Sequence, residues 1–301
     1  MLTINHLQNA QIDKQKWDLT VENSQNGLVY ALSWYLDIVS PGWNALVLGD
    51  YEVVMPLTHR RKWGINYLYQ PVFIKKLGIF SKKIIIHEIA DQFLNKALKY
   101  YKYIDICIDN KPKLFTAQKR LTQILDLSAS YQEIYSKYSK NHHKNIEKAL
   151  NSGLSIHPNN NPGNFITLLE QMYRSKNLKD VSQSDIENLN KIVNYAINHD
   201  LGEMYFGYIE NNLCAAAFFL KWKNRSIIFT AQNKKGREIG AMFSLIDYYI
   251  QKNASKKILL DFAGSMLSGV AKRNKGFGAI DFEYSAFKIN HLPWPFNYLK
   301  K

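Results

Sequence analysis

The chain has 301 residues, of which 46% are hydrophobic, so it is long enough for two globular domains that each bury a core. It has no stretch of about 20 apolar residues, as a membrane-spanning helix needs, and residues 1–10 lack the features of a signal peptide, which together predict a cytoplasmic protein. The net charge of +14 favours anionic partners such as phosphorylated cofactors, nucleotide-linked sugars, tRNA or anionic membranes, although a lysine-rich source genome would give the same charge.

The first group of predicted elements lies between residues 43 and 108. It contains, in chain order, strands at 43–48, 51–58 and 66–70, a helix at 84–101 and a strand at 103–108. The dipeptide Gly49-Asp50 separates the first two apolar runs and favours a hairpin turn. Within the helix, apolar residues recur at every third or fourth position and predict one buried face. These residues are Ile86, Ile89, Phe93, Ala97 and Tyr101.

Residues 131–150 predict an amphipathic helix with two neighbouring stripes. The apolar stripe consists of Ile134, Tyr135, Tyr138, Ile146 and Ala149. The basic stripe consists of Lys137, Lys140, Lys144 and Lys148, which recur every three or four residues. We expect this helix to join two similar halves of the chain.

The second group of elements repeats the order of the first. It contains, in chain order, strands at 204–209, 213–222 and 226–230, a helix through 239–250 and a strand at 257–261. In both groups the last strand is reached through a helix, which is how a parallel strand joins a sheet. The repeated order predicts a tandem duplication of one α/β domain.

Further elements flank the second group. A strand at 154–157 and helices at 165–176 and 183–199 precede it, and a loop or helix at 264–275 and a strand at 279–288 follow it. The complete order resembles the GNAT fold of the acyl-CoA N-acyltransferase superfamily. The predicted fold class is therefore mixed α/β (α+β), with two GNAT-like domains in tandem.

Several motifs resemble a narrower family, the FemABX-like proteins, in which two GNAT domains are fused in one chain. Residues 138–153 are similar to the family's basic helix, which typically reads Arg/Lys-x-Asn-Ile-x-Lys-Ala-x-x-x-Gly, and here include Asn145-Ile146 and Lys148-Ala149. Residues 260–265 and 275–279 are similar to its closing strand and its Lys-x-Phe-Gly element. Tyr69-Gln-Pro71 is similar to a third element in the first half.

The resemblance implies a first GNAT-like domain at 1–129, a connecting basic helix at 130–152 and a second GNAT-like domain at 153–301. It also implies an N-acyltransferase that moves an acyl or aminoacyl group to an amine of an amino sugar, peptide or cell-envelope precursor. No cofactor would be tightly bound, because acyl-CoA or aminoacyl-tRNA would act as co-substrate, and the other substrate would be anionic or nucleotide-linked. The alternatives are a tRNA-dependent transferase of the peptidoglycan type and a non-catalytic protein that binds a nucleotide sugar or glycan.

The loop that binds the cofactor pyrophosphate in GNAT enzymes corresponds to residues 235–240. Lys235, Gly236, Arg237 and Gly240 are the candidate cofactor-binding residues, since backbone amides at a helix start can bind phosphate. Glu238 stands where a glycine is expected, which predicts weak CoA binding because a carboxylate there would face the phosphates. The alternative interpretation of both glycines is a plain loop and helix start.

Two residues are candidates for catalysis. Tyr284 lies in the last predicted strand, where a GNAT tyrosine often protonates the leaving thiolate, but it could also be an ordinary strand residue. Asp261 ends the closing parallel strand, a usual position for ligand-facing groups in open α/β sheets. It would either orient the amine or cap the loop at Gly264-Ser265.

A cluster of cations lies near the C-terminal end. Lys272, Arg273 and Lys275 fall within four positions and suit a phosphate, although a solvated surface loop explains them as well. No metal site is expected, because the adjacent pair His142-His143 would diverge on a helix and both cysteines lie in apolar strands.

Overall fold

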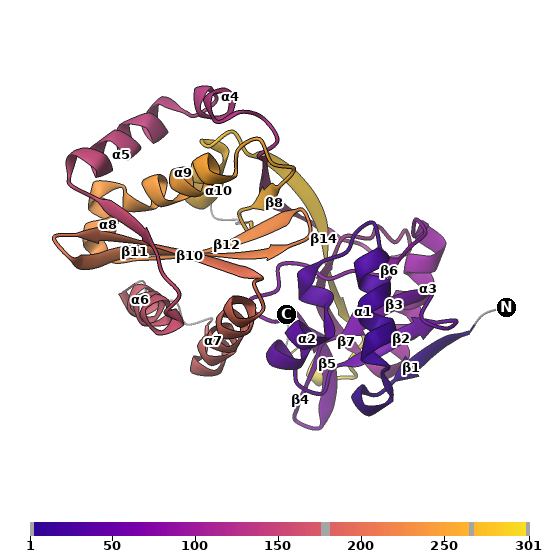
Figure 1. Ribbon diagram of the computed structural model, residues 1–301. Coiled ribbons are helices and arrows are strands. Elements are labelled where there is room, and N and C mark those ends of the chain that lie inside the picture. Colours follow the sequence, from indigo (N-terminus) through magenta and orange to yellow (C-terminus); the bar gives the residue numbers. More distant parts are fainter. Residues whose placement is uncertain (1–2, 176–180, 265–267, 299–301) are drawn as a thin grey trace. The chain divides into compact units, whose positions relative to one another are not determined.

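The computed structural model describes residues 3–175, 181–264 and 268–298 (Figure 1). Its contacts divide the chain into two compact units. The first unit comprises Met1–Arg120 and Glu283–Lys301, and the second comprises Leu121–Phe282. Within the described ranges, no helix is both long enough and apolar enough to cross a membrane.

The first unit contains two sheets, three helices and three short 3-10 turns. In chain order its elements are β1 (Ile4–Leu7), η1 (Asn9–Gln11), α1 (Lys14–Asn23), η2 (Val29–Ala31), α2 (Ser33–Val39), β2 (Asn44–Leu48), β3 (Val53–Leu57), β4 (His59–Lys62), β5 (Ile65–Tyr69), β6 (Phe80–Ser81), α3 (His87–Tyr100), β7 (Tyr103–Ile108) and, after the second unit, most of β14 (Ile280–Asn290) and η3 (Phe296–Tyr298). The strands form a sheet β1-β2-β3-β6 and an array β4-β5-β7-β14.

The helix α3 makes the connection between the parallel strands β5 and β7, as the sequence predicts. Its apolar face includes the fully buried Phe93, Leu94 and Ala97, which pack in one core with residues of β2, β3 and β7. The helix begins only at His87, so the prediction that it starts at residue 84 is wrong, and Ile86 lies outside its buried face with 56% of its surface exposed.

The second unit is a single mixed sheet between two layers of helices. In chain order its elements are β8 (Gln118–Asp126), α4 (Tyr131–Ser136), α5 (Lys140–Asn151), β9 (Ser155–Pro158), α6 (Pro162–Ser175), α7 (Gln183–Asn198), β10 (Gly202–Ile209), β11 (Asn212–Trp222), β12 (Arg225–Gln232), α8 (Lys234–Ile239), α9 (Ala241–Asn253), β13 (Leu259–Asp261) and α10 (Ser268–Lys275). The strand order is β8-β13-β12-β11-β10-β9, and only β12 and β13 are parallel.

The helices cover both faces of this sheet. Figure 1 shows α5 and α9 on one face of β10, β11 and β12, and α6 and α7 on the other. The α9 side buries Leu245 and Tyr249 completely, and Tyr249 stacks on Phe219 of β11 with ring centroids 3.6 Å apart. The parallel pair β12 and β13 is joined through α8 and α9, which repeats the connection of β5 and β7 through α3.

The predicted helix over 131–150 is two helices. Ser130 and Glu133 form a capping box at the start of α4, which ends at Ser136. Ser139 then caps α5, because its hydroxyl accepts the backbone N–H of His142. Ser139 therefore marks the break between the two helices. The apolar residues keep their helical spacing across this break, so their pattern alone does not reveal it.

Two strands pass from one unit into the other. β8 begins with residues of the first unit and pairs with β13 of the second through Ile124–Asp126. β14 begins in the second unit, and its residues Ser285–Asn290 pair with β7 of the first. Contacts thus place Glu283–Lys301 with the first unit. The predicted domain boundaries after residues 129 and 152 stay a prediction.

Candidate functional site

Strand β12 is longer than its parallel neighbour β13. β12 pairs with β11 from Arg225 to Gln232, but it pairs with β13 only from Arg225 to Ile227, because β13 ends at Asp261. Beyond Ile227, Phe229, Thr230 and Gln232 of β12 are half-buried, whereas Ser226 to Ile228 and Ala231 are buried. Alternate residues of this strand end therefore direct backbone polar groups away from β11 and towards an edge without a ladder partner.

Asp261 is the last residue of β13 and lies opposite Ile227 of β12. Its carboxylate accepts hydrogen bonds from the Thr122 hydroxyl at 2.8 Å and from the Ala263 backbone N–H at 2.9 Å, and it forms an ion pair with Arg225 at 2.8 Å. The Asp261 side chain is 7% exposed. These contacts correspond to the loop-capping alternative, with Ser265 outside the described residues; a role in orienting an amine stays a prediction.

The predicted phosphate loop is already helical, because α8 starts at Lys234. Asn233 caps this helix, and its side-chain oxygen accepts the Gly236 N–H at 2.9 Å. A Cβ at Gly236 would lie 2.3 Å from the carbonyl oxygen of Cys214, so this glycine permits close packing of α8 on β11. Lys235 and Arg237 are exposed, which leaves their side chains, rather than the amide of Gly236, available to an anion.

Gly240 separates α8 from α9. Its φ is +80°, and a Cβ there would lie 2.8 Å from the carbonyl oxygen of Asn145 in α5. The residue therefore provides both the left-handed turn between the helices and the close approach of α5. The neighbouring Glu238 is exposed, and its carboxylate lies 3.9 Å from the Lys234 ammonium.

The predicted cation cluster lies on α10, and its members have different environments. Lys275 forms an ion pair with Asp281 at 2.6 Å. Arg273 is half-buried, and its guanidinium donates to the side chain of Asn274 at 3.1 and 3.3 Å. Lys272 is exposed. Binding of a phosphate by all three side chains stays a prediction, and Lys275 would have to exchange its carboxylate partner for it.

His142 of α5 fixes α10 in place. Its Nε2 donates to the carbonyl oxygen of Arg273 at 2.7 Å, and its Nδ1 accepts from the Ser139 hydroxyl at 2.8 Å. A Cβ at Gly276 would lie 1.9 Å from the imidazole ring, so only glycine fits beside it. Burial lowers the pKa of His142, which agrees with a neutral ring in this structural role.

Two buried polar atoms of the second unit were not among the candidates predicted from the sequence. Gln232 Oε1 at the end of β12 and Ser244 Oγ in α9 are buried, and neither has a hydrogen-bond partner among the described residues. Buried polar atoms without partners are rare in folded proteins and often face a ligand. No sequence motif distinguishes these two residues, because their burial depends on how α9 packs on the sheet.

Asp247 of α9 is a second buried carboxylate in this unit, and it clusters with two tyrosine hydroxyls. Its carboxylate accepts from the Tyr131 hydroxyl at 3.1 Å and from the Tyr138 hydroxyl at 3.0 Å. Burial raises the pKa of Asp247 above its usual value, and the two tyrosine hydrogen bonds offset part of that rise. The cluster ties α4 and the start of α5 to α9. Among the described residues, no group of three or more His, Cys, Asp or Glu side chains is arranged to hold a metal ion.

Tyr284 is buried on β14, with 7% of its surface exposed. It belongs to the first unit, whereas Asp261 belongs to the second. The joint catalytic role of these two residues therefore stays a prediction.

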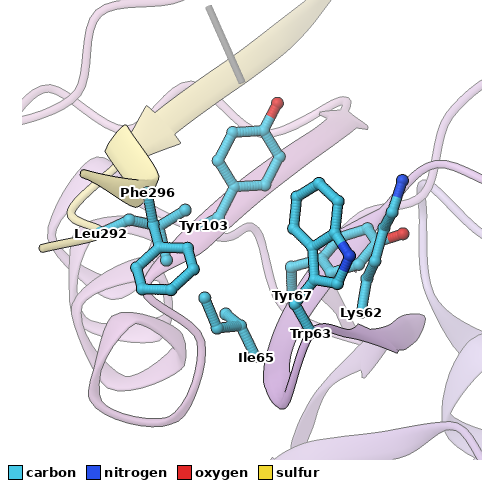
Figure 2. Close-up of a pocket in the computed structure, with 7 residues that line it drawn as sticks. All are labelled: Lys62, Trp63, Ile65, Tyr67, Tyr103, Leu292 and Phe296. Carbon is cyan, nitrogen blue, oxygen red and sulfur yellow. The ribbon is translucent and has the colours of Figure 1, made fainter. Parts of the chain in front are cut away.

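The first unit contains an aromatic pocket (Figure 2). Its lining residues are Lys62, Trp63, Ile65, Tyr67, Tyr103, Leu292 and Phe296. Trp63 is at the turn between β4 and β5, is 63% exposed, and has the Lys62 ammonium 4.6 Å from its ring centroid. Desolvation, together with nearby Asp105, raises the pKa of Tyr103 to about 12. The lining of this pocket contains no carboxylate or histidine.

Comparison with family models and with curated proteins finds no match. Comparison with solved structures finds similar folds over nearly the whole chain. The crystal structure of FemX has a TM-score of 0.62 at 12% identity and covers 98% of this chain and 99% of its own. A conserved protein of unknown function from Bacteroides thetaiotaomicron has a TM-score of 0.60 at 10% identity and covers 96% of this chain and 100% of its own. The chain therefore has a FemAB-like double GNAT fold, and the predicted fold class is confirmed.

Proposed function

We propose that the protein is an N-acyltransferase that transfers an acyl or aminoacyl group to the amine of an amino sugar, a peptide or a cell-envelope precursor. The observation that supports this proposal is that β12 continues past Ile227, where its parallel neighbour β13 ends. This continuation presents strand-edge amides of β12 before the start of α8, in a fold shared with FemX. We assign the acyl donor to this edge of β12 in the second unit.

The chemistry of acyl transfer fits these groups. Attack by a neutral amine on the donor carbonyl puts negative charge on the carbonyl oxygen, which a preorganised backbone N–H can stabilise. The N–H groups of those alternate residues among 228–232 that point away from β11 are the candidates for that role. Asp261 is the proposed positioning group for the amine. The role of Tyr284 as the acid for the leaving group stays a prediction.

The anionic part of the donor would be held by side chains. Because Asn233 occupies the Gly236 amide, we assign phosphate binding to the exposed cations Lys235, Arg237 and Lys272 rather than to a backbone loop. Replacing one of them by alanine should weaken donor binding by about 1–3 kcal/mol, or about ten- to a hundredfold. Lys191 on α7 is exposed and serves as the matched control, because α7 covers the other face of the sheet.

The first experiment identifies the donor class. Acetyl-CoA, aminoacyl-tRNA, deacylated tRNA and UDP-sugars are added separately, and the melting temperature is measured. A ligand at about 100 times its Kd stabilises the folded protein by about 2.7 kcal/mol, which gives a clear shift. The stabilising donor is then incubated with amine acceptors, and the acylated product is detected by mass spectrometry. Binding without transfer would contradict the enzymatic proposal and support a non-catalytic binding protein.

The second experiment uses the unpaired Gln232. Since its Oε1 has no partner among the described residues, Gln232→Ala should leave the melting temperature unchanged or raise it. If this oxygen contacts the substrate, kcat/KM should fall by about ten- to a hundredfold. Gln251→Ala, at an exposed position on α9, is the control and should change neither. An unchanged kcat/KM in both variants would remove Gln232 from the site.

A further inference from the structure

The segment between β6 and α3 exposes aliphatic side chains. It reads Lys82-Lys83-Ile84-Ile85-Ile86, and Ile84 and Ile86 are 75% and 56% exposed. Ile85 between them packs against the core of the first unit, so two exposed isoleucines flank a core contact. Exposed aliphatic residues that gather on one surface often mark an interaction site. Ile84 and Ile86 border a groove whose other wall includes Leu19 of α1, which is also 56% exposed.

A second loop lies beside the same helix. The side chain of Asp91 in α3 accepts the backbone N–H groups of Lys113 at 3.3 Å and Leu114 at 2.9 Å. The imidazole of His87, in the first turn of α3, contacts the carbonyl oxygen of Lys111. These contacts hold the loop at 111–114 against the start of α3, and Leu114 is 73% exposed there.

Four lysines surround these aliphatic residues. Lys82, Lys83, Lys111 and Lys113 are all exposed, and none forms an ion pair within the ranges that the structure describes. Of the nearby acids, Asp91 is occupied by the backbone of the second loop, Glu283 is paired with Lys119, and Asp50 in the groove is paired with Lys16. Glu52, which also lines the groove, and Glu88 are exposed. The patch therefore combines three protruding aliphatic residues with an excess of positive charge.

We propose that this basic apolar patch, formed by Ile84, Ile86, Leu114 and the four lysines, docks the protein on a bilayer that contains anionic lipids. Aliphatic side chains enter the acyl boundary of a bilayer while neighbouring lysines contact anionic headgroups. A protein partner is less well matched, because binding hot spots in protein interfaces are rich in Trp, Tyr and Arg, and the patch contains none of them. The net charge of +14 acts in the same direction.

The test is co-sedimentation of the full chain with lipid vesicles. Vesicles of phosphatidylcholine alone should bind weakly, whereas vesicles that also contain about 30% phosphatidylglycerol should bind strongly. Raising the salt from about 0.1 M to about 0.5 M should reduce the binding, because the headgroup attraction is screened. No binding to the anionic vesicles would overturn the proposal.

Variants separate a local patch from overall charge. Lys82→Gln with Lys83→Gln should lower the partition coefficient about 25-fold, since each lysine near an anionic surface contributes about fivefold. Lys144→Gln with Lys148→Gln on α5 removes the same charge from exposed positions in the second unit and should have a much smaller effect. An equal loss in both pairs would show non-specific attraction and would refute the patch.

The aliphatic contribution has its own control. Ile84→Ser with Ile86→Ser should lower the partition coefficient at least about tenfold without a change in melting temperature, because both side chains are exposed. Leu150→Ser, at a 60% exposed position on α5, should change neither quantity. The remaining alternative is that a second copy of the chain binds the patch, and sedimentation velocity tests it. A dimer that dissociates in the Ile84→Ser variant would assign the patch to self-association and overturn membrane docking.

Discussion

Two buried aspartates of the second unit show how the partner of a carboxylate determines its effect on stability. Asp261 is neutralised by the Arg225 guanidinium at 2.8 Å. Asp247 accepts hydrogen bonds from the neutral hydroxyls of Tyr131 and Tyr138, and burial raises its pKa although these hydrogen bonds lower it. Removing one partner of a buried ion pair leaves a buried charge that is not compensated, which destabilises the fold. A buried carboxylate that has only hydroxyl partners can instead take up a proton and lose its charge.

The first residue-scale prediction concerns Arg225. Arg225→Met should destabilise the protein by about 3–5 kcal/mol, because it leaves Asp261 buried without a cation. Lys275→Met breaks an ion pair of similar length with half-exposed groups and should cost about 0–1 kcal/mol. Urea denaturation at neutral pH measures both values. Similar losses in the two variants would show that burial does not distinguish these pairs.

The second residue-scale prediction concerns Asp247 and the pH dependence of the free energy of unfolding. Its folded-state pKa is raised above the ordinary 3.8, so in the window above pH 3.8 the folded state binds more protons at this site than the unfolded state does. The contribution of Asp247 to stability therefore falls as the pH rises through that window. We expect the stability difference between Asp247→Asn and the unmodified protein to shift in favour of the variant from pH 4 upwards. Urea denaturation at several pH values tests this, and a pH-independent difference would contradict it.

At the scale of the elements, glycines determine where helices approach one another. Gly240 divides the chain between α8 and α9 and lies against Asn145 of α5, and Gly276 leaves room for the ring of His142. In the sequence, Gly236 and Gly240 resembled a phosphate-binding loop. In the structure, both glycines make close packing contacts with another backbone. The absence of a side chain lets a glycine approach a neighbouring backbone as closely as it could approach a phosphate.

A pair of glycines with almost the same φ isolates the packing contribution. Gly240 has φ +80° and lacks room for a Cβ, whereas Gly153 has φ +76° and no atom within 4 Å of the Cβ position. Both alanine variants should lose about 1–2 kcal/mol of unfolding free energy, because alanine is strained in the left-handed backbone conformation. Gly240→Ala should cost about 1–3 kcal/mol more, because Asn145 must move. Thermal and urea unfolding measure the difference in stability between the two variants. Equal losses would show that α5 moves away from the added Cβ without a loss of stability.

For the whole molecule, the pairing of β14 with β7 makes the first unit depend on a distant part of the chain. Strand β7 pairs with Ser285–Asn290, and Phe287 from that segment is 1% exposed in the core of the first unit. The first unit therefore cannot complete its core until the C-terminal segment is present. Such long-range pairing also slows folding, because a long loop must close before the contact forms.

Truncation after Phe282 tests this dependence. Without β14 residues 283–290, strand β7 loses its antiparallel neighbour and the core loses Phe287, so amide exchange in β5 and β7 should accelerate strongly. Amides of β10, β11 and β12 should exchange at nearly the original rate, because their partners lie within Leu121–Phe282. Hydrogen-exchange mass spectrometry measures both groups. A uniform acceleration across the chain would show that the two units fold as one.

The sequence by itself determined the fold class, the repeated strand–helix–strand order and the parallel connection through α3 and through α8 and α9. These features follow from apolar periodicity and chain order, which are local properties. Only the tertiary structure decided that α3 starts at His87, that β14 completes the first unit, and that Gly236 and Gly240 pack against Cys214 and Asn145. Each of these depends on atoms that are distant in the chain and adjacent in space. A sequence pattern carries no record of such contacts.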